Sequence, residues 1–131
     1  MFLDASAIIA IVAAESDADV LGAKLGRAPR IYVSAIVVYE ATLGLARKGN
    51  IAIADARRLL DHFLESVSAE FAPITPALGE RAILAFERFG KGRHKASLNL
   101  GDCFAYACAQ DLGVPLLFKG DDFSQTDVRT A

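Results

Sequence analysis

Short apolar runs alternate with longer segments of helical periodicity along this chain. Apolar residues spaced three and four apart, as over residues 52–67, are typical of a helix with one face in the core. Short apolar runs bounded by turn residues are typical of buried strands. The runs that predict strands are Met1–Leu3, Ile31–Val33, Phe71–Ile74 and Pro115–Phe118, with a further short edge strand expected near Val128.

Helices are predicted between these runs, and capping residues indicate where they begin and end. Ser34 precedes one long helix that Gly49 ends, and Thr75–Pro76 begins another that reaches about Phe89. The other helices are expected over residues 5–14, from Ser16 or Asp17 to about 27, over 52–67 and over 101–112. Because strands and helices alternate, we expect an α/β fold with a mainly parallel central sheet of four to five short strands, covered on both faces.

The composition indicates one folded domain over residues 1–131. Hydrophobic residues make up 53% of the chain, which supports a dense core. No apolar run is long enough to cross a bilayer, and the apolar N-terminal segment lacks the basic start of a signal peptide. We therefore expect a cytoplasmic protein without membrane contact. Cys103 and Cys108 are expected in the core, because their spacing fits neither a disulfide within one helix nor a zinc motif.

The formal net charge of −2 argues against a broad phosphate-binding surface. If nucleic acid is the substrate, the contacts must come from local basic patches. The loop Gly90–Lys95 is one such patch, in which Lys91, Arg93 and Lys95 are candidates for holding RNA phosphates; an ordinary solvated loop is the alternative. Lys119 follows the last strand beside two acids, where it could contact a scissile phosphate or balance charge.

Three acidic residues, Asp4, Glu40 and Asp102, lie in almost uniformly apolar stretches of the sequence. Each has an ordinary explanation. Asp4 could cap a helix, Glu40 could be an exposed residue or a partner of Arg47, and Asp102 could be a first-turn acid favoured by the helix dipole. Taken together, three acids in such surroundings indicate a functional cluster.

The predicted topology brings acids from both ends of the chain to one edge of the sheet. Asp4 ends the first strand, and Asp121 and Asp122 follow the last. Sites in parallel sheets form at the carboxyl ends of the strands. Convergent carboxylates repel one another unless a cation neutralises them, and they are the hard oxygen ligands that a divalent metal ion prefers.

The chain resembles the PIN-domain nucleases, and in particular the VapC toxins of bacterial type II toxin–antitoxin systems. The resemblance covers essentially the whole chain and rests on Phe2–Ala7, the helix with Glu40, Asn99–Ala107 and Leu116–Phe123, in this order. It implies a PIN-like α/β/α sandwich and metal-dependent hydrolysis of RNA phosphodiesters, with tRNA or ribosomal RNA as the expected substrate.

The resemblance also implies roles for the acids. Asp4 and Asp102 would ligate Mg²⁺ or Mn²⁺, with Glu40 as a further catalytic acid and Asp121 or Asp122 as the fourth. We favour Asp122, because the family's turn often reads Gly-Asn-Asp-Phe and so keeps an acid at that position. Asp121 is instead expected to bond backbone amides in an Asx-turn.

Further implications concern substrate and partners. Ser6 matches a family hydroxyl near the site, which suggests a part in substrate binding. The family implies a homodimer and a cognate VapB-type antitoxin that blocks the acidic pocket. The apolar residues of two early helices could serve either the core or a partner groove: Val37, Val38, Leu45, Ile53, Leu60 and Leu64.

Two alternatives belong to other functional classes. One is a PIN-like RNA- or protein-binding module that has lost catalysis; the retained acids argue against it. The other is a phosphorelay receiver domain, which would need paired acids after the first strand and a phosphoacceptor aspartate ending the third. Here the first strand ends in a single acid and the third is followed by Thr75 and Pro76.

Overall fold

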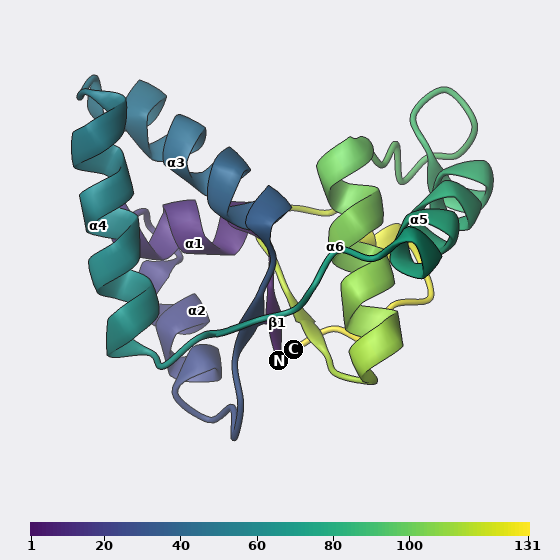
Figure 1. The fold of residues 1–131 in the computed structure, drawn as a ribbon, viewed down its shortest axis with the longest axis horizontal. Coiled ribbons are helices and arrows are strands. Elements are labelled where there is room, and N and C mark those ends of the chain that lie inside the picture. The colour runs from purple at the N-terminus through teal and green to yellow at the C-terminus, as the bar shows by residue number, and fades with distance from the viewer.

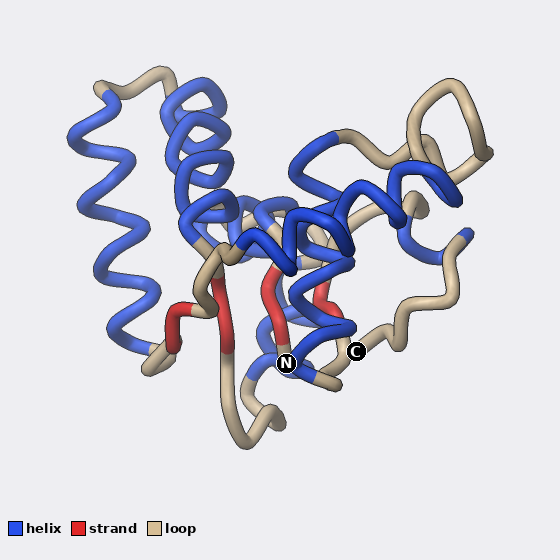
Figure 2. The backbone as a smooth tube through the Cα atoms, turned by 45° about the vertical axis from the view of Figure 1, so that its right-hand side comes forward, coloured by secondary structure: helices blue, strands red, loops and turns tan.

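A parallel four-stranded sheet lies at the centre of the computed structural model, which describes residues 1–131. The strands, each of two residues, are β1 (Phe2–Leu3), β2 (Tyr32–Val33), β3 (Glu70–Phe71) and β4 (Leu116–Leu117). Their order across the sheet is β3-β2-β1-β4, and Phe2 pairs with Tyr32 on one side and Leu116 on the other. Figure 2 shows the strands side by side, with their ends at a common edge.

Helices cover both faces of this sheet, so the predicted α/β/α architecture is confirmed (Figure 1). The first four helices lie on one side, and α6 packs against β1 and β4 on the other with α5 outside it. The helices are α1 (Ala5–Val12), α2 (Ala18–Leu25), α3 (Ala35–Gly49), α4 (Ile53–Ser66), α5 (Pro76–Phe89) and α6 (Leu100–Leu112), followed by a short 3₁₀ helix, η1 (Phe123–Gln125).

Side-chain caps fix where four of these helices begin. Asp4, Ser34, Thr75 and Asn99 each accept a hydrogen bond from a backbone N–H in the first turn of α1, α3, α5 and α6. The predicted caps at Ser34 and Thr75 are thus confirmed. The cap at Asp17 is not, since α2 begins after it without a side-chain bond.

The third strand differs from its prediction. It was expected over residues 71–74 as a buried strand, whereas β3 covers Glu70 and Phe71 at the exposed edge of the sheet. The Glu70 N–H donates to the carbonyl of Ile31, just before β2, and the Ala72 N–H donates to that of Val33, but Pro73 has no N–H to continue the ladder. The strand expected near Val128 is likewise reduced to a single bridge between Leu116 and Thr130.

Most of the apolar residues of the early helices belong to the core. Of the six that could have faced a partner, only Ile53 is exposed. Cys103 and Cys108 are buried and free, as expected. The helices of the structure are all too short or too polar to cross a membrane.

Candidate active site

Asp4 directly follows the carboxyl end of β1 and is also the N-cap residue of α1. Its side chain is 4% exposed, and its Oδ2 accepts hydrogen bonds from the backbone N–H of Ser6, at 2.9 Å, and from the Ser6 hydroxyl. The capping explanation is therefore correct for Asp4. It is compatible with ligation, because a capping carboxylate keeps its charge at the positive end of the helix.

Asp102 lies in the first turn of α6, where it forms a reciprocal capping box with Asn99. The Asn99 N–H donates to Asp102 Oδ2 and the Asp102 N–H donates to Asn99 Oδ1, both at 2.9 Å. These bonds fix the orientation of the Asp102 carboxylate and leave Oδ1 without a hydrogen-bond partner. One carboxylate, oriented by hydrogen bonds, thus lies at the beginning of α1 and another at the beginning of α6.

Glu40 approaches α6 from α3, one helical turn into that helix. Its carboxylate lies against Gly101: a Cβ at Gly101 would come within 2.1 and 2.2 Å of the two Glu40 oxygens. Glu40 is half-buried and forms no ion pair, so the explanation as a partner of Arg47 is wrong. Gly101 is therefore the residue whose missing side chain gives Glu40 its place beside Asp102.

Burial raises the pKa values of all three carboxyl groups, and neighbouring acids add to the rise at Glu40 and Asp102. Burial, and then the charges of Asp4 and Asp102, raise the pKa of Glu40 to about 7. Burial is also the main reason that the pKa of Asp102 rises to about 6, opposed by the Asn99 N–H and assisted by Asp4. Burial raises the pKa of Asp4 despite its bonds to Ser6. The cluster therefore holds repulsion that no cationic side chain relieves.

The structure separates the two adjacent acids of the last turn. The charge of Asp122 raises the pKa values of Asp4 and Asp102, whereas Asp121 affects neither. The Asx-turn expected at Asp121 is absent: its backbone carbonyl, not its carboxylate, accepts the Ser124 N–H and hydroxyl. Both acids are exposed, but only Asp122 lies within electrostatic reach of Asp4 and Asp102.

Ser6 and Lys119 hold the last turn against α1. The Ser6 hydroxyl, which donates to Asp4, also accepts the Lys119 N–H at 3.0 Å. The Lys119 ammonium does not turn toward the cluster, because it pairs with Glu15 and, at 3.1 Å, with Asp17. Of the two interpretations of Lys119, the geometry favours charge balance, with Glu15 and Asp17 as the balanced acids.

The basic loop follows the end of α5 and belongs to the connection from α5 to α6 (Figure 1). Lys91, Arg93 and Lys95 are all exposed and form no ion pair, and Arg93 Nε donates to the Glu87 carbonyl at 3.3 Å. His94 is held inward, with its ring 5.2 Å from that of Phe89. The three cationic side chains are therefore free to meet an anion.

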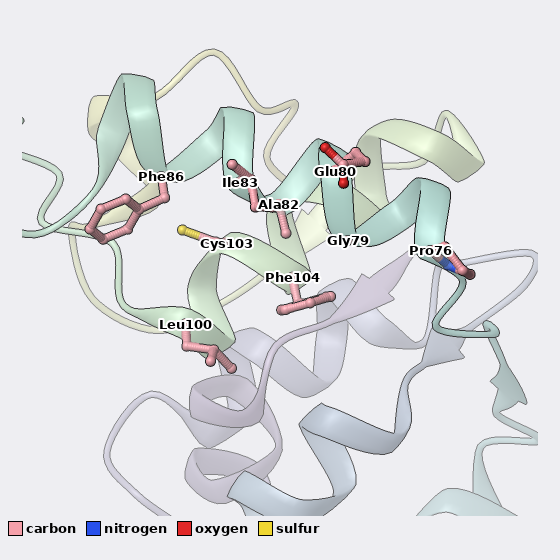
Figure 3. A pocket seen from close by; sticks show the side chains of 9 residues that line it. All are labelled: Pro76, Gly79, Glu80, Ala82, Ile83, Phe86, Leu100, Cys103 and Phe104. Atoms are coloured by element: carbon pink, nitrogen blue, oxygen red, sulfur yellow. The ribbon is translucent and has the colours of Figure 1, made fainter.

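An apolar groove of about 550 Å³ runs between α5 and α6. Figure 3 shows side chains of both helices lining it, among them Ile83 and Phe86 of α5 and Leu100 and Phe104 of α6. The acids are not part of its wall. On α6, Leu100, Cys103 and Phe104 face the groove, whereas Asp102, two residues after Leu100, lies on a different side of the helix.

The donor set fits a hard divalent cation. In the structure, no three acidic, histidine or cysteine side chains converge as a ready-made metal-binding group. The fit rests instead on the chemistry of the cluster: Glu40 lacks a cationic partner while Asp4 and Asp102 raise its pKa. A bound cation would remove the repulsion between these carboxylates. Carboxylate oxygens are also the ligands that Mg²⁺ and Mn²⁺ prefer.

Comparison with known proteins assigns the family. The model of the PIN domain family matches residues 1–129. The chain belongs to the PIN domain family. A VapC ribonuclease of Rhizobium meliloti is 42% identical, covering 97% of this chain and 98% of its own. Ribonuclease VapC42 of Mycobacterium tuberculosis is 40% identical, covering 100% and 98%.

A solved structure shows the same fold at lower sequence identity. The crystal structure of VapC20 of Mycobacterium tuberculosis, described as a sarcin–ricin-loop-cleaving toxin, superposes with a TM-score of 0.79. The superposition covers 99% of this PIN domain and 97% of the other chain at 18% identity. The predicted family and fold are thus confirmed, and the receiver-domain alternative is excluded by the family match.

Sequence reasoning missed Gly101, although a signal for it was present. Glycine is unfavourable in a helix, yet Gly101 occupies the second position of α6. We expect Gly101→Ala to keep or raise the thermal midpoint, because alanine favours the helix by up to about 1 kcal/mol. We also expect RNA cleavage to fall at least about tenfold, because the new Cβ displaces the Glu40 carboxylate.

A matched control is Gly79→Ala, since Gly79 lies in α5 with open space around its Cβ position. Thermal unfolding and cleavage rates of both variants test the assignment. A Gly101→Ala protein with unchanged cleavage would show that the position of Glu40 does not matter.

Proposed function

We propose that this PIN domain is a VapC-type toxin, an endoribonuclease that hydrolyses RNA phosphodiesters. Family membership and full-length similarity to proteins named VapC ribonucleases support the proposal. The observation that carries it is the acidic cluster: the charges of Asp4 and Asp102 raise the pKa of Glu40, and no cationic side chain pairs with any of the three. A cluster of this kind destabilises a protein unless it binds a cation.

Asp4 and Asp102 would hold Mg²⁺ or Mn²⁺, with Glu40 and Asp122 as further acids of the site. A divalent cation there supplies Lewis-acid activation of water and of the scissile phosphate. Other residues of the chain position the carboxylates that would hold the cation. Ser6 fixes Asp4, the capping box with Asn99 fixes Asp102, and Gly101 leaves room for Glu40.

The basic loop is proposed to hold RNA phosphates. Changing Lys91, Arg93 and Lys95 together to alanine is expected to raise KM several-fold and leave kcat nearly unchanged. For single-stranded RNA, each lost phosphate contact lowers the slope of log K against log salt by about 0.7. Binding measured across a salt series tests this.

A charge-matched control changes Arg27, Arg57 and Arg58 to alanine. Arg27 follows α2, and Arg57 and Arg58 belong to α4, so none of the three lies in the basic loop. We expect that control to bind RNA as the wild type does. If both triple variants show the same slope of log K against log salt, the loop is an ordinary solvated loop that does not bind RNA phosphates.

Partners are proposed from the family. We infer a VapB-type antitoxin and a homodimer, both in the cytoplasm. Two apolar surfaces are available to them: the α5–α6 groove, and a patch on α3 and α4 with exposed Tyr39 and Ile53. Expression of this chain alone should arrest growth, and the adjacent reading frame should relieve the arrest. An arrest that persists in the Asp4→Asn variant would indicate toxicity unrelated to cleavage.

The direct test is incubation of the purified protein with total RNA, with mapping of new 5′ ends. tRNA and ribosomal RNA are the proposed substrates. We expect discrete cuts with 5′-phosphate ends in Mg²⁺ or Mn²⁺, and none in EDTA. A folded protein that binds RNA but cuts none under any metal would instead identify an inactive PIN-like module.

A further inference from the structure

The segment Lys119–Asp127 carries Asp122 and is held at both of its ends. At one end, the Lys119 N–H donates to the Ser6 hydroxyl. At the other, Asp127 receives the Tyr106 hydroxyl and, at 2.8 Å, the Arg88 guanidinium. Between these two anchors, Asp122 is exposed.

The anchor at Asp127 joins this segment to both outer helices. Tyr106 belongs to α6, where it is 7% exposed, and Arg88 belongs to α5. Arg88 Nη1 also lies 3.4 Å from the Tyr106 hydroxyl, so the three side chains form a closed network. Arg88 and Asp127 are themselves exposed, so the hydroxyl of the buried Tyr106, rather than the ion pair, is the firmer part of this anchor.

The residues between Asp122 and Asp127 couple the position of Asp127 to that of Asp122. Phe123 is 2% exposed, and its ring packs 5.0 Å from that of Phe118. The Thr126 N–H and hydroxyl both donate to the Phe123 carbonyl, at 3.0 and 2.7 Å. The chain from Asp127 back to Asp122 is thus a compact turn, in which a shift at one end moves the other.

We propose that Asp127 is a positioning residue: through Tyr106 and Arg88, it sets where Asp122 stands relative to Asp4 and Asp102. The inference rests on the proposed function in that it gives Asp122 a place in the metal site. Asp127 itself touches no reacting atom in this scheme. Its effect is on the order of the turn and, through it, on the fourth acid.

Two variants test this, Asp127→Ala and Tyr106→Phe. The second keeps the buried ring and removes only the hydroxyl, so it remains informative where the first unfolds. The matched control is Arg81→Ala, which breaks the exposed Arg81–Asp111 pair between the same two helices without touching the segment.

The first readout is hydrogen exchange of the backbone amides of Ser124, Gln125 and Thr126, which are bonded within the turn. We expect these amides to exchange about tenfold faster in both test variants than in the wild type. In the control variant they should exchange at the wild-type rate. This readout does not depend on cleavage, so it separates failure of the inference from failure of the proposed function.

The second readout is the Mn²⁺ concentration that half-saturates binding, measured by calorimetry. We expect it to rise several-fold in Asp127→Ala and Tyr106→Phe and to stay at the wild-type value in Arg81→Ala. Wild-type exchange in the turn, or faster exchange spread evenly over α5 and α6, would overturn the inference. So would an unchanged Mn²⁺ affinity in a variant whose turn is more mobile.

Discussion

Replacing Asp4 or Asp102 with asparagine is expected to reduce metal-dependent RNA cleavage at least about a hundredfold. Asparagine keeps the size of the side chain and can still accept the Ser6 or Asn99 N–H, so the caps of α1 and α6 survive. What is lost is the negative charge that a divalent cation needs. Because burial raises the pKa values of both groups, their removal should leave the thermal midpoint unchanged or higher.

The control for this prediction is Asp111→Asn, an exposed acid of α6 that pairs with Arg81. It removes the same charge from the same helix as Asp102→Asn, but outside the cluster. Cleavage should stay within about twofold of the wild type, as for most surface changes. An Asp4→Asn protein that is folded and cleaves RNA at the wild-type rate would contradict the assignment.

The metal-free protein is expected to lose stability as the pH rises from about 5 to 7.5. The pKa of Glu40 lies near 7 in the folded protein and 4.5 is its ordinary value; for Asp102 the corresponding values are about 6 and 3.8. Below the ordinary values both states are protonated, and nothing is lost. Between the ordinary and the raised values, the unfolded chain is ionised while the folded protein still binds the proton. The free energy of unfolding therefore falls as the pH rises, and the fall ends above the raised values.

The size of this effect is moderate, because Glu40 and Asp102 are only partly buried. After allowance for solvent screening, we expect about 1–2 kcal/mol, or a thermal midpoint lower by roughly 3–10 °C at pH 7.5. Scanning calorimetry in EDTA at pH 5.5 and 7.5 measures it. Saturating Mn²⁺ should reverse the loss at pH 7.5, since binding to the folded state alone stabilises it.

Glu40→Gln isolates the contribution of the cluster. It should raise the midpoint at pH 7.5 in EDTA and reduce the difference between the two pH values. Glu15, Glu70 and Asp127 have pKa values lowered by their bonds to cationic or hydroxyl partners, so they titrate below this range and cancel between variant and wild type. A Glu40→Gln protein with the pH dependence of the wild type would show that Glu40 carries no such cost.

The sequence predicted the parts of the site that depend on local pattern. An acid directly after an apolar strand, as at Asp4, must lie at the carboxyl edge of a parallel sheet. An acid in the first turn of a helix, as at Asp102, must lie at its positive end. The first rule predicts that Asp4 meets the acids after the last strand. The grouping of Asp102 with Asp4 came instead from their similar apolar surroundings in the sequence and from the family resemblance.

Other features depended on which partner a side chain finds in three dimensions. Lys119 lies beside acids in the sequence, yet its ammonium pairs with Glu15 and Asp17 of a distant turn. The network of Asp127 joins residues 21 and 39 positions apart. Helical periodicity also could not distinguish a core face from a partner face, and burial placed five of the six residues in question in the core. Pairings over such distances leave no periodic signal.

Calorimetric titration with Mn²⁺ tests the central claim most directly, because it asks whether the acidic cluster is a cation site. The wild type and the Asp4→Asn/Asp102→Asn double variant are titrated at pH 7.5 after removal of metal with EDTA. We predict saturable Mn²⁺ binding by the wild type and none by the double variant, with both proteins folded. Equal binding by the two proteins, or a wild type that cleaves RNA without binding Mn²⁺, would contradict the account.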